Sequence, residues 1–529
     1  MFKGKIYEKI GKKCYNFYVG ENMKKLFRFL FSRFTIGAVL IILQVLWIIL
    51  WLNVAYQVYS WMQFVIIFLE LLLIIDLSNR DMSADLKIPW LAVVMLVPVA
   101  GIIIYLLFSR NMPRKKDRRF SKELFVKTQE TISDFEQDSK MLGEKYEGQS
   151  NYIKHTCNCG LFVNTKTKYF DCGETFFKDY VEDLKKAEKF IFMEYYILSY
   201  GVMLNTILDI LKEKAKNGVE VRLMYDDIGS ISYLPFNFAR SLRKEGINCI
   251  KFHPFLPFVT ALHNNRDHRK ITVIDGKIGY VGGINIADEY INEIKRFGYW
   301  KDSTIRLEGD ATRQLTVMFL QTFNLQRRQK EDYQQYTQID FEPVEGTGFV
   351  QPLCDGPSPI YRELICENAY LNMINQAKKS VWITTPYLII DTQTKTSLIN
   401  AAKRGVRVKI FTPHIPDKKI IFALTRSNYR ELINNGVEIY EYRPGFIHTK
   451  NFLVDDEIAI VGTINLDYRS LVHHYECGVW MYQTESIKEL QNDFENILND
   501  SIYIDPKTFK LKFSEKIVAA VLKIFSPIL

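Results

Sequence analysis

The stretch His268–Asp275 reads HRKITVID, and a related stretch, HTKNFLVD, returns at His448–Asp455. Both copies have the order histidine, lysine and aspartate at the same spacing, H-x-K-x4-D. Each copy is followed by a short tail that ends in asparagine, Gly282-Gly283-Ile284-Asn285 in the first and Gly462-Thr463-Ile464-Asn465 in the second. The interval from histidine to asparagine is the same in both copies. We therefore interpret the two stretches as parts of a duplicated catalytic unit.

Each motif has the pattern of a strand that enters a hairpin. Because alternate residues of a strand point to the same face, His268 and Lys270 are predicted to project together. Asp275-Gly276 is a favoured hairpin turn, and a tight turn brings Gly283 opposite His268, where a small residue leaves room for a ligand. The second copy has the same order at His448, Lys450, Asp455, Asp456 and Thr463.

The duplication extends beyond the motifs. A strand, a helix and a second strand are predicted before each of them, at 190–197, up to 216 and 219–224, and again at 381–388, up to 404 and 406–411. Gly218 and Gly405 follow the two helices, as expected for helix ends. Further strands are predicted at 246–250 and 436–440. The sequence therefore predicts an α/β fold with two tandem repeats packed around a pseudo-two-fold axis.

These residue types suit a phosphate group. Lysine supplies a point charge, here from Lys270 and Lys450, and Asn285 and Asn465 add neutral donors for phosphate oxygens. A neutral imidazole can attack phosphorus, and a protonated one can donate to a leaving oxygen. Since each half offers one motif histidine, nucleophile and general acid are expected to come from different repeats.

Carboxylates are expected to support the histidines. Asp302 and Glu476 follow the two motifs, and either can orient an imidazole by accepting its other N–H. Asp275 and Asp455 complete the catalytic motifs, but their turn positions indicate a supporting or structural role. The eight cysteines show no zinc spacing, and Cys157-Asn158-Cys159 is too tight for a zinc site by itself, so ordinary reduced thiols are expected. The sequence predicts a reaction without metal or cofactor.

The N-terminal third has a different composition. A basic segment is followed by apolar runs at 35–52, 61–75 and 88–108, of which the first and third are long enough to span a membrane. The basic flanks both favour the cytoplasmic side, which requires an even number of crossings, whereas three runs are candidates. Either one run does not cross or one basic flank lies outside, so two or three spanning helices are expected. The predicted organisation is a basic segment (1–34), a transmembrane region (35–110), a linker (111–150), a first repeat (151–335), a second repeat (345–508) and a C-terminal amphipathic helix (509–529) that lies on a membrane or packs on the protein.

The doubled H-x-K-x4-D pattern resembles the phospholipase D superfamily. Further segments are similar to the bacterial cardiolipin synthases within it: Asn264–Lys270, Ile284–Tyr290, Trp300-Lys301-Asp302, Tyr225–Ser230, Asp355-Gly356-Pro357, Thr385-Pro386-Tyr387 and Ser526–Leu529. The similarity runs from about residue 60 to the C-terminus. The sequence departs from the family pattern at Thr463 and at His473-His474, where many relatives have Leu-Asn.

The resemblance implies phosphatidyl transfer between two phosphatidylglycerol molecules, giving cardiolipin and glycerol through a phosphohistidine intermediate. It implies His268 as the nucleophile and His448 as the acid and then the base. It also implies a multi-pass protein of the bacterial plasma membrane whose partners are phosphatidylglycerol and the lipid bilayer, with no nucleic acid. The oligomeric state and the side of the membrane are left open.

Four other functions are compatible with parts of this pattern. A hydrolytic phospholipase D would release the same intermediate to water, and a related transferase would use phosphatidylethanolamine. A nuclease of the superfamily fits the net charge of +9 but has no need of apolar helices. A catalytically idle membrane scaffold does not need intact histidine and lysine in both halves.

Overall fold

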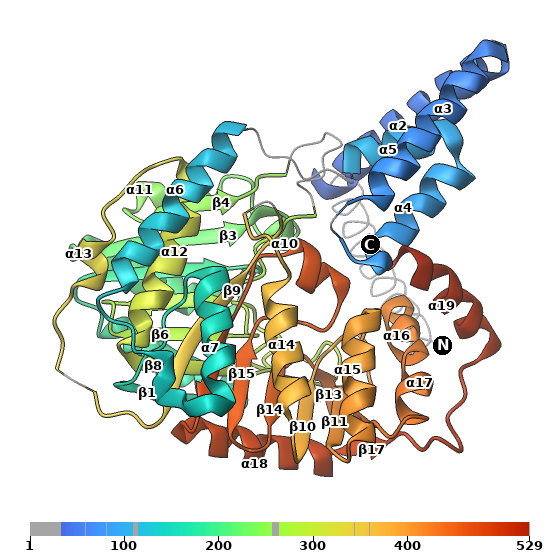
Figure 1. Ribbon diagram of the computed structural model, residues 1–529. Coiled ribbons are helices and arrows are strands. Elements are labelled where there is room, and N and C mark those ends of the chain that lie inside the picture. The colour runs from blue at the N-terminus through green and yellow to red at the C-terminus, as the bar shows by residue number, and fades with distance from the viewer. Residues whose placement is uncertain are drawn as a thin grey trace, which may run out of the picture.

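The computed structural model describes residues 33–58, 60–80, 82–108, 115–255, 264–342, 344–358 and 360–527. They form an α/β body from which a group of helices near the N-terminus projects (Figure 1). Residues 1–32 of the predicted basic segment lie outside the described part of the chain.

Two mixed sheets form the body, and their strands follow the same spatial order. The first sheet has the order β1-β8-β6-β5-β2-β3-β4 and the second has β9-β16-β15-β14-β10-β11-β12-β17. The first consists of β1 (Thr165–Phe170), β2 (Phe190–Tyr195), β3 (Glu220–Asp226), β4 (Asn248–Phe252), β5 (Ile271–Ile274), β6 (Ile278–Gly282) and β8 (Thr304–Gly309). The second consists of β9 (Phe349–Asp355), β10 (Ser380–Thr384), β11 (Arg407–Pro413), β12 (Glu438–Tyr442), β14 (Asn451–Val454), β15 (Ile458–Gly462), β16 (Glu476–Tyr482) and β17 (Ser501–Tyr503). The prediction of an α/β fold with two related units is confirmed.

Helices cover both sheets (Figure 1). The first half contains α8 (Gly173–Lys185), α9 (Val202–Lys216), α10 (Asp227–Ser230), α11 (Phe238–Lys244), α12 (Ala311–Arg327) and α13 (Gln334–Thr337). The second half contains α14 (Ile365–Gln376), α15 (Thr392–Lys403), α16 (Lys419–Ser427), α17 (Tyr429–Ile433) and α18 (Glu485–Asn499). Before the first sheet, α6 (Lys115–Ile132), the short η1 (Ser139–Leu142) and α7 (Gly143–Cys157) fill most of the segment predicted as a linker. The exact domain boundaries stay a prediction.

The predicted strand–helix–strand units are present in both halves, as β2-α9-β3 and β10-α15-β11. Gly218 and Gly405 follow their helices with φ of 89° and 91°, in the region that glycine adopts without a steric penalty. The predicted strands before each motif correspond to β4 and β12, shifted by two residues at their starts. Shifts of this size are ordinary for helix and strand ends.

The halves contact each other through reciprocal backbone bonds. The N–H of His268 donates to the carbonyl of Tyr475 at 3.0 Å, and the N–H of His448 donates to the carbonyl of Lys301 at 2.7 Å. The short strands β7 (Tyr299–Lys301) and β13 (Gly445–Ile447) pair in parallel next to the second of these bonds. The exchange of equivalent contacts means that each half completes the other around an approximate two-fold axis. One hydrophobic core also includes residues of both halves.

The helices before the body are α2 (Arg33–Val58), α3 (Ser60–Ser78), α4 (Ala84–Leu96) and α5 (Pro98–Phe108). The run 88–108 is divided between α4 and α5, because Pro98 lacks the N–H that would continue the helix. Across the described residues, no helix is both long and apolar enough to cross a bilayer. The structure therefore does not confirm the predicted transmembrane region at 35–110.

The C-terminal segment forms α19 (Phe513–Phe525), which lies against α16 and α4 (Figure 1). Its opposite face carries exposed apolar side chains, including Phe513, Ile517 and Val521. The helix is thus packed on the protein, as one of the two predictions has it, and its contact with a membrane stays a prediction.

Candidate active site

The two motif histidines lie immediately before β5 and β14, where the two halves meet. His268 and His448 are 6% and 7% exposed, so both are almost fully buried. The charges of His448 and Lys450 act on His268, and the charge of Lys270 acts on His448. The structure therefore brings the predicted histidines and lysines of both halves to a single site.

His268 is held by a carboxylate from the other half. Its Nδ1 lies 2.9 and 3.1 Å from the two carboxylate oxygens of Glu476. Glu476 is in turn held by the hydroxyls of Thr463 and Ser470, and the Ser470 bond is 2.6 Å long. Because Nδ1 is engaged, Nε2 is the ring nitrogen left to face a substrate.

His448 is held in the reciprocal way. Its Nδ1 lies 2.6 Å from Oδ2 of Asp302, which belongs to the first half. The other oxygen of Asp302 accepts the N–H of Ser303 at 2.9 Å. Asp302 and Glu476 are both fully buried. The sequence identified these two carboxylates as supports, and the structure pairs each one with the histidine of the opposite half.

Gly283 leaves space for the carboxylate of Asp302 rather than for a ligand. A Cβ atom at this position would lie 2.0 Å from Oδ1 of Asp302, which is far inside van der Waals contact. The register of β5 and β6 pairs Ile271 with Val281, which sets Ile284 rather than Gly283 across from His268. The predicted pairing is wrong because Asp275–Lys277 forms a three-residue connection instead of a two-residue turn, and one extra residue shifts the register by one.

The two lysines point back along their strands. Lys270 Nζ donates to the carbonyl of His268, and Lys450 Nζ donates to the carbonyl of His448. An ammonium has three donors, so each lysine keeps donors for an anion beside the imidazole. Both are almost fully buried.

Burial governs the charge state of these groups. It lowers the pKa of Lys270 to about 8 and that of Lys450 to about 7, against the opposing effect of Glu476 and Asp302. Burial, and then the charge of Lys450, lowers the pKa of His448 to about 4; the pKa of His268 is also well below its ordinary value, mainly through burial and Lys270. Although burial acts to raise it, Lys450 and His448 hold the pKa of Asp302 below its usual value. At neutral pH the imidazoles are therefore neutral, Lys270 is mostly cationic and Lys450 is about half protonated.

The two asparagines differ. The amide of Asn285 accepts the N–H of Ile197 at 2.9 Å and donates to the hydroxyl of Tyr290 at 2.7 Å, which leaves one N–H for a ligand. Asn465 is 6% exposed, and its side-chain oxygen has no hydrogen-bond partner among the described residues. A role in binding phosphate stays a prediction for both.

Asp275 and Asp455 lie at the far ends of their strands. The carboxylate of Asp275 accepts the backbone N–H groups of Glu188, Lys189 and Phe190 at 2.7–2.8 Å. The carboxylate of Asp455 accepts those of Lys378, Lys379 and Ser380. Four strand residues separate each aspartate from its lysine, about 16 Å along the chain. Their contacts fix the loops that enter β2 and β10.

Aromatic and imidazole rings that the sequence did not identify as site residues surround the histidines. His474 lies with its ring centre 5.5 Å from that of His268, and Trp300 lies 5.4 Å from His448. Each of these rings comes two residues before the carboxylate that holds its histidine, so their equivalence was visible in the sequence once the carboxylates were known. Tyr196 adds an edge contact to His268 at 5.1 Å.

Two groups in the described residues bring together side chains of the kind that bind metal ions. His268, His474 and Glu476 have ligand atoms within 4.8 Å of one another, and so do Cys157, Cys159 and Cys354. In the first group Nδ1 of His268 already contacts Glu476. In that group, Glu476 orients the imidazole of His268.

Comparisons with known proteins show which family this chain resembles. A family model described as cardiolipin synthase, PLD-like domain, matches residues 180–296 and 370–498, and one described as phospholipase D-nuclease N-terminal matches residues 64–110. A cardiolipin synthase of Alkalihalophilus pseudofirmus is 36% identical over 86% of this chain and 91% of that protein, and one of Geobacillus kaustophilus is 35% identical over the same shares.

One solved structure supports the fold. Phosphatidylserine synthase of Haemophilus influenzae Rd KW20 has a TM-score of 0.55 and 15% identity, and the match covers 73% of this chain and 100% of that one. At this identity the likeness concerns the fold alone.

Proposed function

We propose, from the premise that this chain belongs to the cardiolipin synthase family of phosphatidyltransferases, that its paired site transfers a phosphatidyl group from one phosphatidylglycerol to another. The observation that carries the proposal is the reciprocal pairing of His268 with Glu476 and of His448 with Asp302. Each pair presents a neutral Nε2 beside a cationic lysine. This arrangement suits displacement at a phosphodiester that carries one negative charge.

In the first step Nε2 of His268 attacks phosphorus, and the bond from phosphorus to the glycerol oxygen breaks. His448, protonated on Nε2 once the anionic phosphate is bound, gives its proton to the leaving glycerol. The intermediate is a phosphatidyl group on His268. Lys270 and Lys450 stabilise the charge on the phosphate oxygens.

In the second step the terminal hydroxyl of another phosphatidylglycerol attacks the same phosphorus. His448 takes the hydroxyl proton, the bond from phosphorus to nitrogen breaks, and cardiolipin leaves with His268 restored. The carboxylates Glu476 and Asp302 hold the two rings and stabilise positive charge when it forms on them. No step requires a metal ion.

The test is to incubate purified protein with phosphatidylglycerol vesicles in the presence of a chelator. Cardiolipin and glycerol are expected products. Phosphatidic acid and glycerol would instead identify a hydrolase, and cardiolipin formed only with added phosphatidylethanolamine would change the donor or acceptor. Loss of activity in the chelator, restored by a divalent metal, would contradict the mechanism.

The largest mutational effect is expected at the histidines. His268→Asn and His448→Asn should each lower kcat by more than about 10⁴-fold, because each removes a group that bonds to the reacting atoms. The two variants separate the roles: with a substrate whose leaving group is p-nitrophenol, which needs no acid, His448→Asn should still form a phosphatidyl adduct on His268. Mass spectrometry of the labelled peptide checks this, and an adduct on residue 448 of His268→Asn would reverse the assignment.

A lipid bilayer is the proposed surrounding of the projecting helices. Large apolar side chains on α2 and α3 are exposed, among them Trp47, Trp51, Phe64 and Phe68 at 60–78%. Apolar patches of this kind on a protein mark contact with lipid or protein. The sequence leads to the expectation of a multi-pass protein of the plasma membrane. Two or three crossings by these helices belong to this proposal. Quenching of tryptophan fluorescence by brominated lipids in reconstituted vesicles tests it, and unquenched fluorescence would contradict it.

A further inference from the structure

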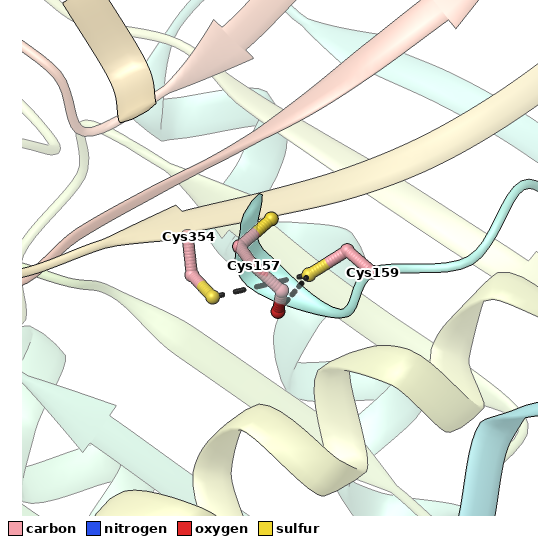
Figure 2. A group of neighbouring side chains, drawn as sticks. All are labelled: Cys157, Cys159 and Cys354. Atoms are coloured by element: carbon pink, nitrogen blue, oxygen red, sulfur yellow. Dashed lines mark hydrogen bonds between the residues drawn. The ribbon is translucent and has the colours of Figure 1, made fainter. Parts of the chain in front are cut away.

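Three cysteines that the proposed reaction does not use meet in the core. Cys157 ends α7, Cys159 follows it in the next loop, and Cys354 lies on β9 (Figure 2). The sulfurs of Cys159 and Cys354 are 3.8 Å apart, and all three sulfurs lie within 4.8 Å of one another. Each of the three residues is at most 2% exposed. Cys157 and Cys159 are too close in the sequence to form a metal site by themselves, but Cys354, far along the chain, adds a third sulfur.

The separation of the Cys159 and Cys354 sulfurs, 3.8 Å, matches that expected in a metal–thiolate site. With metal–sulfur bonds of about 2.3 Å, sulfurs around a tetrahedral ion are about 3.8 Å apart and those around a trigonal ion about 4.0 Å apart. A disulfide would require the sulfurs of Cys159 and Cys354 to approach to about 2.05 Å. The cluster as it stands is therefore closer to the geometry of a bound ion than to that of a disulfide.

Three sulfur ligands also define the class of ion. Thiolates select soft cations such as Cu⁺ and Zn²⁺, whereas Mg²⁺, Ca²⁺ and Mn²⁺ prefer oxygen. Burial leaves no open face for a substrate, so the site has the character of a structural one.

We propose that Cys157, Cys159 and Cys354 bind one thiophilic d¹⁰ cation, Zn²⁺ or Cu⁺, that ties the end of α7 to β9. On binding, the three thiols release their protons to solvent and three metal–sulfur bonds form. The site lies behind the active centre: on the paired strands β9 and β16, Cys354 is opposite Cys477, and Asp355 is opposite Glu476. The ion would stabilise the strand pair that carries Glu476 without taking part in the reaction.

Elemental analysis of the full-length protein, purified in detergent under anaerobic reducing conditions, tests the site. About one equivalent of zinc or copper per chain is expected, either as isolated or after dialysis against buffered Zn²⁺ or Cu⁺ in separate arms. Cys159→Ser and Cys354→Ser should lose the ion. Cys249→Ser is the matched control, because Cys249 is equally buried but lies on β4, and it should keep the ion.

A second measurement on the unaltered protein covers the case in which the serine variants do not fold. X-ray absorption at the metal edge should show sulfur neighbours at about 2.3 Å. Cysteine-free coordination, failure of both ions to bind, or a Cys159–Cys354 disulfide found by mass spectrometry of the protein as isolated would each overturn the proposal. The chelator test of catalysis is independent, because activity without free metal and a buried structural ion can both hold.

Discussion

His268 and His448 occupy equivalent positions in the two halves, yet their surroundings differ. His268 faces a glutamate that two hydroxyls hold, with a second imidazole, His474, beside it. His448 faces an aspartate that approaches through the space left by Gly283, with Trp300 beside it. Duplication thus supplied two copies of one backbone arrangement. The side chains around the histidines have diverged, as expected if one ring attacks phosphorus and the other moves protons.

The same comparison shows that neither half contains a complete site. The carboxylate for each imidazole comes from the opposite half, and so does the carbonyl that accepts the histidine N–H. A single half would leave each imidazole without the carboxylate that orients it. The site and the contact between the halves therefore form together.

Replacing the two carboxylates is the most direct test of the difference between the two histidines. Asp302→Asn and Glu476→Gln should each lower kcat by about 10²–10⁴-fold, because the imidazole loses the acceptor that fixes its tautomer. With the p-nitrophenol substrate, adduct formation should recover in Asp302→Asn, which affects the proton-transferring His448. It should stay slow in Glu476→Gln, which affects the nucleophile.

Asp183→Asn is the control for these carboxylate variants. Asp183 is a buried carboxylate of α8 that pairs with Arg306 away from the site, so its loss should affect stability rather than the reaction. Equal recovery of Asp302→Asn and Glu476→Gln with the activated substrate would contradict the exchange of partners between the halves.

Substitutions at the equivalent positions Gly283 and Thr463 test how each half positions its carboxylate. Gly283→Ala places a methyl group 2.0 Å from the present position of Asp302 Oδ1, so the carboxylate must move. A displacement of about 1 Å in a catalytic group costs about 10²-fold in rate. Thr463→Gly removes only one hydroxyl from Glu476 and should cost about tenfold. Steady-state kcat on phosphatidylglycerol checks both, and a larger loss for Thr463→Gly would mean that the hydroxyl, rather than the space, limits the geometry.

The pH dependence reports the lysines. With pKa values lowered to about 7 and about 8, mainly by burial, Lys450 and Lys270 lose their protons as the pH rises through this range. The free site then loses the charge that binds phosphate, so kcat/KM should fall by about tenfold per unit between pH 7 and 8 and by about 100-fold per unit above pH 8, where both lysines lose their protons. On the acid side it should hold until the nucleophile His268 gains a proton, because burial and the charge of Lys270 keep the pKa of this imidazole well below its ordinary value.

Lys450→Arg provides the control for this profile. Arginine keeps its charge at every accessible pH, so the alkaline loss should become shallower even though the level of activity drops, because the guanidinium does not match a point charge. A flat kcat/KM up to pH 9.5 in the unaltered protein would show that the lysines stay charged and would contradict the assignment.

Much of this site could be predicted from local sequence patterns. The spacing of His268, Lys270 and Asn285 follows from strand and turn geometry, and its repetition identified the two-part site. Asp302 and Glu476 were recognised as supports, but not which histidine each one holds, because that depends on how the sheets pack. Gly283 was predicted opposite His268, which is wrong by one residue. Nothing in the local sequence indicates that Lys277 belongs to the connection between β5 and β6.

Contacts between distant residues explain the remaining differences. Cys354 is far from Cys157 and Cys159 in the sequence, and only the packing of β9 against the end of α7 brings the three sulfurs together. His474 and Trp300 could likewise be assigned to the site only after the carboxylates two residues later had been placed beside the histidines. The apolar run 88–108 looked continuous by hydropathy, whereas the backbone restriction of Pro98 divides it into two helices.

The smallest effect on catalysis is expected at the aspartates of the two motifs. Asp275→Asn and Asp455→Asn remove a charge that accepts three backbone N–H groups, which should lower the free energy of unfolding by about 1–3 kcal/mol. Asparagine tolerates the positive φ of 53° and 54° at these positions, so the backbone strain does not change. The kcat of the folded protein should stay within about threefold, because about 16 Å of strand separates each carboxylate from its lysine. Thermal unfolding and kcat are measured on the same preparations.

Asp456→Asn is the matched control, since Asp456 is the exposed neighbour in the same turn with a φ of 59°. It should change neither stability nor rate. The aspartate is part of the repeated motif, yet its contacts are with the loops that enter β2 and β10. A variant of Asp275 or Asp455 that unfolds at the normal temperature but has lost its activity would place the carboxylate in the reaction itself. A less stable protein with normal kcat would separate the two functions of the motif, with histidine and lysine serving the reaction and aspartate holding their strand.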